Sequence, residues 1–173
     1  MKNKPNPFSI TSHIIEERLQ NIDNELKVLD RSAEKSFLTV YNQIKYAIRA
    51  IDKQHAKTMS VVMSALAEYE PGVVQAFADH TIVHQMLGQK LLEKTEALLL
   101  HSSEKATATA ALIHQFNKYS TVIHENINRE EVTLRPLLLR YYDEQEMALM
   151  QVQIEQVLSS KNLQTLVPEP MVA

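Results

Sequence analysis

Apolar residues recur along this chain at spacings of three and four, the pattern of amphipathic helices. Five such segments predict five helices. The first begins at Ser9 or Ser12 and ends near 30–32, the second covers about 33–69, the third about 73–101, the fourth follows Ser103 and runs to about Tyr142, and the fifth follows Asp143. Pro71 and Gly72 are typical of a helix end, which places the second helix before them. Asp143 with Glu146 predicts a capping box that starts the fifth helix.

Long helices joined by short connections predict an all-α protein. The expected arrangement is an up-down-up-down four-helix bundle, with the short fifth C-terminal helix packed across or beside it. We assign the bundle domain to 9–158 and find no domain boundary inside it. Residues 1–8, with Pro5 and Pro7, are predicted to be an extended lead-in. Residues 159–173, which contain two prolines, are predicted to be a flexible tail.

Composition supports helices and excludes several classes of function. Two glycines among 173 residues are too few for the turns that a sheet requires. The absence of cysteine excludes disulfides, thiolate metal sites and cysteine nucleophiles. The charges that give a net value of -3 are mixed along the chain, so no basic face predicts nucleic-acid binding.

No segment resembles a membrane span or a signal peptide, and we expect a cytoplasmic protein with no membrane partner. Enzyme chemistry is not indicated, because we find no nucleophile with a base, no phosphate loop and no paired carboxylates.

Four polar residues fall on stripes that are otherwise apolar. His55 lies on the stripe of the second helix, His80 and His84 lie on that of the third, and Glu130 lies on that of the fourth. A carboxylate buried without a partner is costly, so Glu130 requires one. Inward-facing His and Glu on neighbouring helices are how bundles build metal sites. Imidazoles with a carboxylate and no thiolate suit iron, zinc or manganese.

Other interpretations of these residues remain open. In a metal-free bundle Glu130 would be hydrogen-bonded to His55 or His80, as a polar pair that determines helix register. Histidines on facing helices also suit axial ligation of a haem. A solvated pair is the better interpretation of His124 and Glu131, at the edge of the stripe of the fourth helix. His13 is ambiguous, since in a regular helix it lies opposite the apolar stripe of the first helix.

One segment resembles a known family. The pattern EExxLxPLL, followed by a DEQE cap and a final helix, resembles the C-terminal signature of hemerythrin-like (HHE cation-binding) domains. Its residues are Glu130, Glu131, Leu134, Pro136, Leu137 and Leu138. The order of the histidines before it is also similar, and the resemblance covers roughly 12–158. It implies a four-helix bundle around a non-haem di-iron centre held by histidines and bridging carboxylates. Such proteins carry or sense oxygen, respond to nitric oxide, sense iron, or repair iron–sulfur clusters.

Carried over by position, the resemblance implies a role for each candidate residue. His13 would be the ligand from the first helix, and His55 would be the histidine of the HxxxE motif on the second. His80, with His84, would be the ligand from the third helix. Glu130 would be the carboxylate of the HxxxE motif on the fourth helix.

Two positions depart from the family pattern. Met59 stands where the second helix should carry a carboxylate, and Asn126 stands where the fourth should carry a histidine. A thioether cannot bridge two iron ions, and a neutral amide is a weak ligand. We therefore expect an incomplete or mononuclear site.

The expected function is that of a hemerythrin-like metal-binding protein. Its cofactor would be non-haem iron, as one ion rather than two, and it would sense or handle oxygen, nitric oxide or iron. The partner would then be a diatomic gas or a metal ion. The alternative is a metal-free bundle that serves as an interaction or regulatory module. That module would act through a protein partner or as a homodimer, formed by the heptad-like stripe of the first helix or by the fifth helix.

Overall fold

The computed structural model describes residues 5–29, 34–101 and 105–159, and within these ranges the chain is helical, with no strand. The helices are α1 (Ser9–Val28), α2 (Glu34–Leu66), α3 (Pro71–His101), α4 (Lys105–Tyr141) and α5 (Glu144–Ser159). The prediction of an all-α chain with five helices is therefore confirmed. The tail predicted for 160–173 lies outside the described residues, as do 1–4 of the predicted lead-in.

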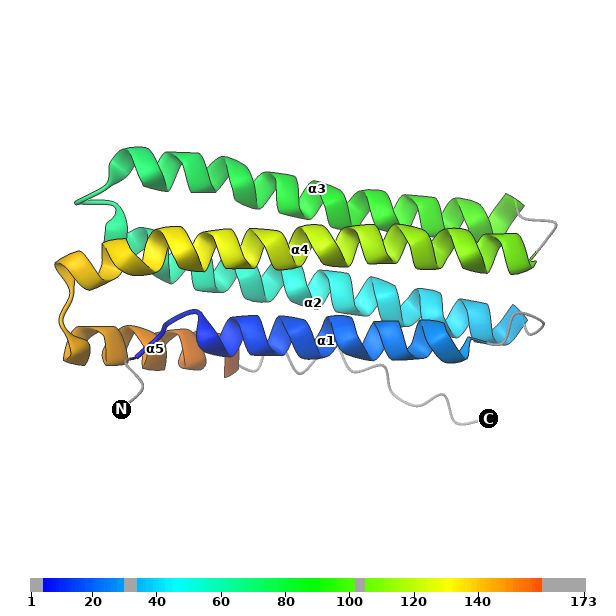
Figure 1. Ribbon diagram of the computed structural model, residues 1–173, viewed down its shortest axis with the longest axis horizontal. Coiled ribbons are helices and arrows are strands. Elements are labelled where there is room, and N and C mark those ends of the chain that lie inside the picture. The colour runs from blue at the N-terminus through cyan, green and yellow to red at the C-terminus, as the bar shows by residue number, and fades with distance from the viewer. Residues whose placement is uncertain (1–4, 30–33, 102–104, 160–173) are drawn as a thin grey trace.

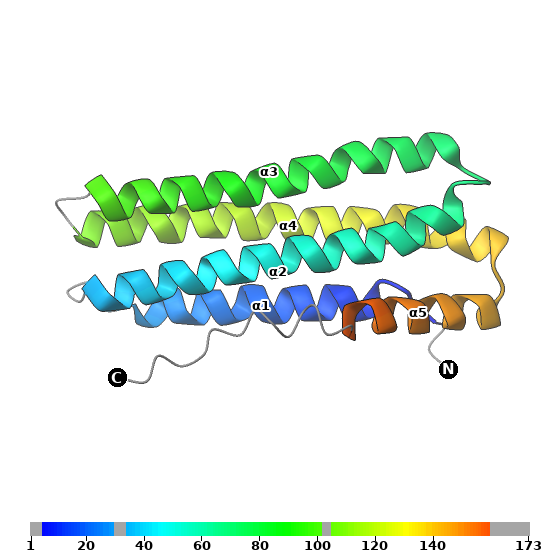
Figure 2. The ribbon, with the colours of Figure 1, turned by 180° about the vertical axis from the view of Figure 1, so that it is seen from behind.

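The four long helices lie side by side, and each runs in the opposite direction to the one before it (Figure 1). The view from behind shows α2 between α3 and α1, in agreement with its contacts to both (Figure 2). The shorter α5 lies at the end of the molecule where α1 begins and α4 ends, and it packs mainly against α2.

The loop between α2 and α3 lies earlier in the chain than the sequence predicted, because it covers 67–70 rather than 70–72. The α2 helix ends at Leu66, whose carbonyl accepts hydrogen bonds from the backbone N–H groups of Tyr69 and Glu70. The α3 helix begins at Pro71 itself. Proline suits the first turn of a helix, because its missing N–H would have no partner there. Pro71 therefore opens α3 rather than only stopping α2.

The capping box of α5 is confirmed. The carboxylate of Asp143 accepts hydrogen bonds from the backbone N–H groups of Gln145 and Glu146, at 2.8 and 2.9 Å. The side chain of Glu146 accepts in turn from the N–H of Asp143, at 2.8 Å. These bonds satisfy donors that every helix start leaves unpaired. They start α5 directly after α4 has ended at Tyr141.

Two apolar clusters form the core. The first joins the apolar stripes of α1 to α4 and contains Ile15, Leu19, Ile22, Leu26, Ile44, Ile48, Ile51, Leu91, Leu112, Phe116 and Ile123. The second brings in α5 and contains Phe8, Met59, Val62, Leu66, Leu134, Leu138, Met147, Met150, Ile154 and Leu158. The apolar spacing of the fifth segment predicts a buried face of Met147, Met150, Ile154 and Val157. The structure corrects its last member, because Leu158 is buried and Val157 is only half-buried. The stripes of α1 and α5 are thus buried within their own chain. None of the helices in the described ranges combines the length and apolar character that a bilayer span requires.

Candidate functional site

A layer of polar side chains separates the two apolar clusters. We call it the polar layer, and its buried members are Thr11 on α1, Gln54, His55 and Thr58 on α2, His84 on α3, and Asn126 and Glu130 on α4. On α2 the core passes from Ile51 in the first cluster to Met59 in the second, and the polar residues lie between them. Burying polar groups costs free energy unless they are hydrogen-bonded. Each group in the layer therefore needs a partner.

The partner of Glu130 that the structure shows is His55. Nε2 of His55 lies 2.8 and 2.9 Å from the two carboxylate oxygens of Glu130. The side chains are 3% and 4% exposed, so water does not replace this contact. The pair joins α2 to α4 across the interior. It confirms that Glu130 lies inside and that His55 faces it.

His84 stacks on His55 from α3. The two ring centroids are 4.5 Å apart, and the ring planes differ by only 4°. Nδ1 of His84 lies 3.2 Å from Oδ1 of Asp52, whose side chain is 21% exposed. Nε2 of His84 is buried and has no hydrogen-bond partner among the described residues. A continuous row of polar groups therefore runs from the interior to the surface. It consists of Glu130 on α4, His55 on α2, His84 on α3 and Asp52 on α2.

Two residues beside the polar layer, Asp52 and Gly88, are not among the predicted site residues. Asp52 stands three residues before His55 and so shares its side of α2, which is the signal that identifies it. Gly88 is one of only two glycines and lies inside a helix, where glycine usually has a packing reason. A Cβ atom at Gly88 would lie 2.6 Å from Cγ2 of Ile48 and 3.4 Å from Oδ2 of Asp52. Gly88 therefore permits the close approach of α2 and α3 beside His84.

Further contacts hold the helices around the layer. The hydroxyls of Thr11 and Thr58 lie 2.6 Å apart and are buried. Nε of Arg18 donates to the side-chain oxygen of Gln54 at 3.2 Å. Both contacts join α1 to α2 at the level of the histidines. They determine the register of these two helices.

Tyr119 lies beside Gly88 on the α4 side. Its hydroxyl is buried without a hydrogen-bond partner among the described residues. Burial raises the pKa of Tyr119, and the negative charge of Asp52 raises it further. The phenol therefore stays protonated next to the carboxylate that contacts His84.

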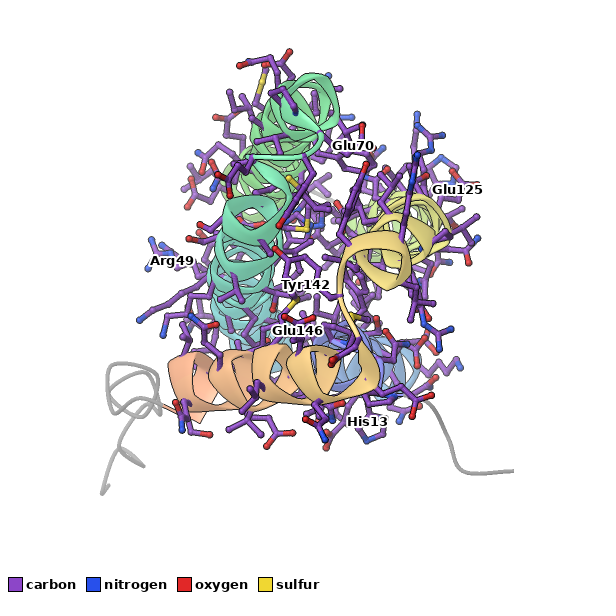
Figure 3. All side chains as sticks on the ribbon, turned by 90° about the vertical axis from the view of Figure 1, so that its left-hand side faces the viewer. His13, Arg49, Glu70, Glu125, Tyr142 and Glu146 are labelled. Atoms are coloured by element: carbon purple, nitrogen blue, oxygen red, sulfur yellow. The ribbon has the colours of Figure 1, made fainter. Side chains whose placement is uncertain are left out.

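His13 does not join the polar layer. It is exposed and lines a surface groove of ≈ 520 Å³ between α1 and α4, together with Glu17 and His124. Figure 3 shows it at the periphery of the molecule. The reason is its position on α1, opposite the buried Ile15. His13 therefore lies apart from the polar layer, and its role as the first-helix ligand stays a prediction.

Three of the residues considered in the sequence remain: His80, His124 and Glu131. The side chain of His80 lies outside the described part, so its role as a ligand stays a prediction. His124 is exposed as expected, with Nδ1 2.7 Å from the carbonyl oxygen of Ser120. Glu131 accepts a hydrogen bond from Asn6 at 2.7 Å rather than from His124.

The donor atoms are not gathered around a common point. Among the described side chains, no group of three or more His, Asp or Glu is arranged to hold a metal ion. The lone pairs of an imidazole lie in the plane of its ring, and the planes of His55 and His84 are nearly parallel. The two rings therefore cannot point at one ion while they are stacked.

Three comparisons with known proteins complete the description of the site. No family model, no curated protein and no solved structure matches the chain.

Proposed function

We propose that this chain is a hemerythrin-like protein whose polar layer holds one non-haem metal ion, with Fe²⁺ as the expected ion. The observation that carries the proposal is Nε2 of His84, which is buried beside His55 and Glu130 and has no hydrogen-bond partner in the part of the chain that the structure describes. Leaving a buried polar atom unsatisfied costs roughly 1–3 kcal/mol. A cation at Nε2 would supply the missing interaction.

The residues fit one ion better than two. Two imidazoles and one carboxylate are a donor set that suits iron, zinc or manganese. A second ion would need a further carboxylate, and Met59 lies instead in the second apolar cluster. Asn126 is buried and offers only a neutral amide. The proposed centre therefore consists of His55, His84 and Glu130, with His80 as a further predicted ligand on α3.

Loading the centre requires the chain to move. Since the rings of His55 and His84 are parallel, one imidazole must turn out of the stack before both can face the same ion. Nε2 of His55 must also leave the carboxylate of Glu130, which it contacts through both oxygens. In the described arrangement His55 and Glu130 bond to each other, while Nε2 of His84 has no partner among the described side chains.

The proposed role is sensing or handling of oxygen, nitric oxide or iron. A ferrous ion held by His55, His84 and Glu130 would supply open coordination positions for a diatomic gas. The protein would shield the ion from solvent, because the side chains of His55 and Glu130 are almost completely buried. The antiparallel order of α1 to α4 is compatible with the up-down-up-down bundle that the hemerythrin resemblance implies.

A second candidate function is that of a metal-free hemerythrin-like bundle acting as an interaction or regulatory module. The close contact between His55 and Glu130 favours it, because this pair satisfies both residues without any ion. In this candidate the stacked histidines hold α2 against α3, and the contact between His55 and Glu130 holds α2 against α4. Metal content separates the two candidates.

The test is metal analysis of the purified protein after anaerobic incubation with Fe²⁺ and removal of excess ion. We expect about one iron per chain in the wild type, and a large loss in His84→Ala and Glu130→Ala because each removes a ligand. His124→Ala is the matched control, since it removes an exposed histidine and should leave the iron content unchanged. Circular dichroism verifies that each variant is folded.

Equal and sub-stoichiometric iron in all four proteins would refute the metal proposal. A melting temperature that chelator leaves unchanged would then support the metal-free module. A chelator-induced fall in the wild type that is absent from Glu130→Ala would support the metal centre instead.

A further inference from the structure

Asp52 contacts His84 at only one of its two ring nitrogens. Oδ1 of Asp52 lies 3.2 Å from Nδ1, while Nε2 on the other side of the ring has no partner among the described residues. The two nitrogens of a neutral imidazole are not equivalent, because one carries the proton and the other carries the lone pair. The contact with Asp52 therefore determines which ring nitrogen of His84 carries the proton and which carries the lone pair.

An ionised carboxylate can accept hydrogen bonds but cannot donate them. Nδ1 of His84 must then carry the proton and donate it toward Asp52. The lone pair is left on Nε2, the buried nitrogen. A partly exposed carboxylate thus determines the chemical character of an atom at the opposite edge of a fully buried ring.

The packing of α2 against α3 keeps this contact in place. Gly88 lies one turn after His84 on α3, and a Cβ atom there would crowd both Ile48 and Oδ2 of Asp52. Without a side chain at 88, the carboxylate has room beside α3 and reaches the ring of His84. The contact is therefore built into the helix interface.

We infer that Asp52 is the positioning residue of His84: it holds the ring in the tautomer that leaves the lone pair on Nε2, which is the tautomer that the proposed metal centre would require. The role in a metal centre rests on the proposed function. The tautomer of His84 does not, because it can be measured in the metal-free protein. A carboxylate behind a ligating histidine determines the orientation of the ring and raises its basicity. The loss of such a partner typically costs about 10–100-fold in metal affinity.

The first measurement is the long-range ¹H–¹⁵N spectrum of the imidazoles in the metal-free protein. We expect a protonated Nδ1 and a bare Nε2 for His84 in the wild type. In Asp52→Asn we expect a mixture of tautomers or the opposite one, because an amide can donate as well as accept. A role limited to helix packing would leave the tautomer unchanged. A wild-type spectrum with the proton on Nε2 would overturn the inference.

The second measurement is the affinity for Fe²⁺, from anaerobic competition with a chromophoric chelator. We expect Asp52→Asn to bind about 10–100-fold more weakly than the wild type. Glu93→Gln is the control, because it removes one negative charge from an exposed position on α3 and should leave the affinity unchanged. Equal affinities in Asp52→Asn and the wild type would overturn the inference. A wild type that binds no Fe²⁺ would refute the proposed function, and the tautomer spectrum would still decide whether Asp52 positions His84.

Discussion

Replacing Glu130 with alanine should destabilise the chain strongly. Both members of the His55–Glu130 pair are almost fully buried, and Nε2 of His55 contacts two oxygens of Glu130. Truncation removes these contacts and leaves a buried imidazole facing a cavity. Breaking a buried pair by removing one partner costs about 3–5 kcal/mol. For a domain of this size, that corresponds to a fall in melting temperature of about 6–20 °C.

The assay is urea unfolding followed by far-UV circular dichroism, in buffer with a chelator so that bound metal does not contribute. Glu125→Ala is the control on the same helix, because Glu125 is exposed at the periphery (Figure 3) and its loss should change the unfolding free energy by no more than about 0.5 kcal/mol. A double-mutant cycle with His55→Ala isolates the pair, and we expect a coupling energy of about 1–3 kcal/mol.

Two results would refute this reasoning. The first is a cost for Glu130→Ala below about 1 kcal/mol, which is within the range of ordinary substitutions. The second is a coupling energy near zero, which would mean that His55 and Glu130 stabilise the fold independently. Either result would show that the contact between them does not hold the polar layer together.

The remaining predictions concern the helix interface and the surface. Gly88→Ala should lower the unfolding free energy by about 1–3 kcal/mol, because its Cβ would lie 2.6 Å from Cγ2 of Ile48. Gly72→Ala meets no atom within 4 Å and should be neutral or slightly stabilising in the same urea assay. Burial and the hydrogen bond donated to Glu96 raise the pKa of Tyr41 from 10.0 to about 12. The folded state therefore holds this proton more tightly than the unfolded state, so the contribution of Tyr41 to stability is complete below pH 10.0 and is lost as the pH rises to about 12. Tyr41→Phe should flatten the dependence of the urea midpoint on pH in this window, and an unchanged slope would contradict the assignment.

The periodicity of the sequence was enough to identify all five helices, because amphipathic spacing and helix caps are local properties. Glu130 and His55 could be placed inside for the same reason, since each interrupts a stripe that is otherwise apolar. The capping box at Asp143 was predictable because all its members lie within four residues.

The spacing of apolar residues predicted the ends of the helices less accurately than their interiors. Pro71 could be recognised as a boundary but not as the first residue of α3. The choice between Val157 and Leu158 on α5 depended on the rotation of a helix against neighbours that are distant in sequence.

The pairing of the polar groups depends on the tertiary structure. His55 and Glu130 are 75 residues apart, and either His55 or His80 satisfied the sequence pattern as a partner for Glu130. Asp52 lies at the surface edge of α2 and becomes part of the site only because α3 passes close to it at Gly88. Periodicity specifies which face of each helix turns inward. The rotation and register of one helix against the next, which depend on packing over the whole core, decide which side chains on those faces meet.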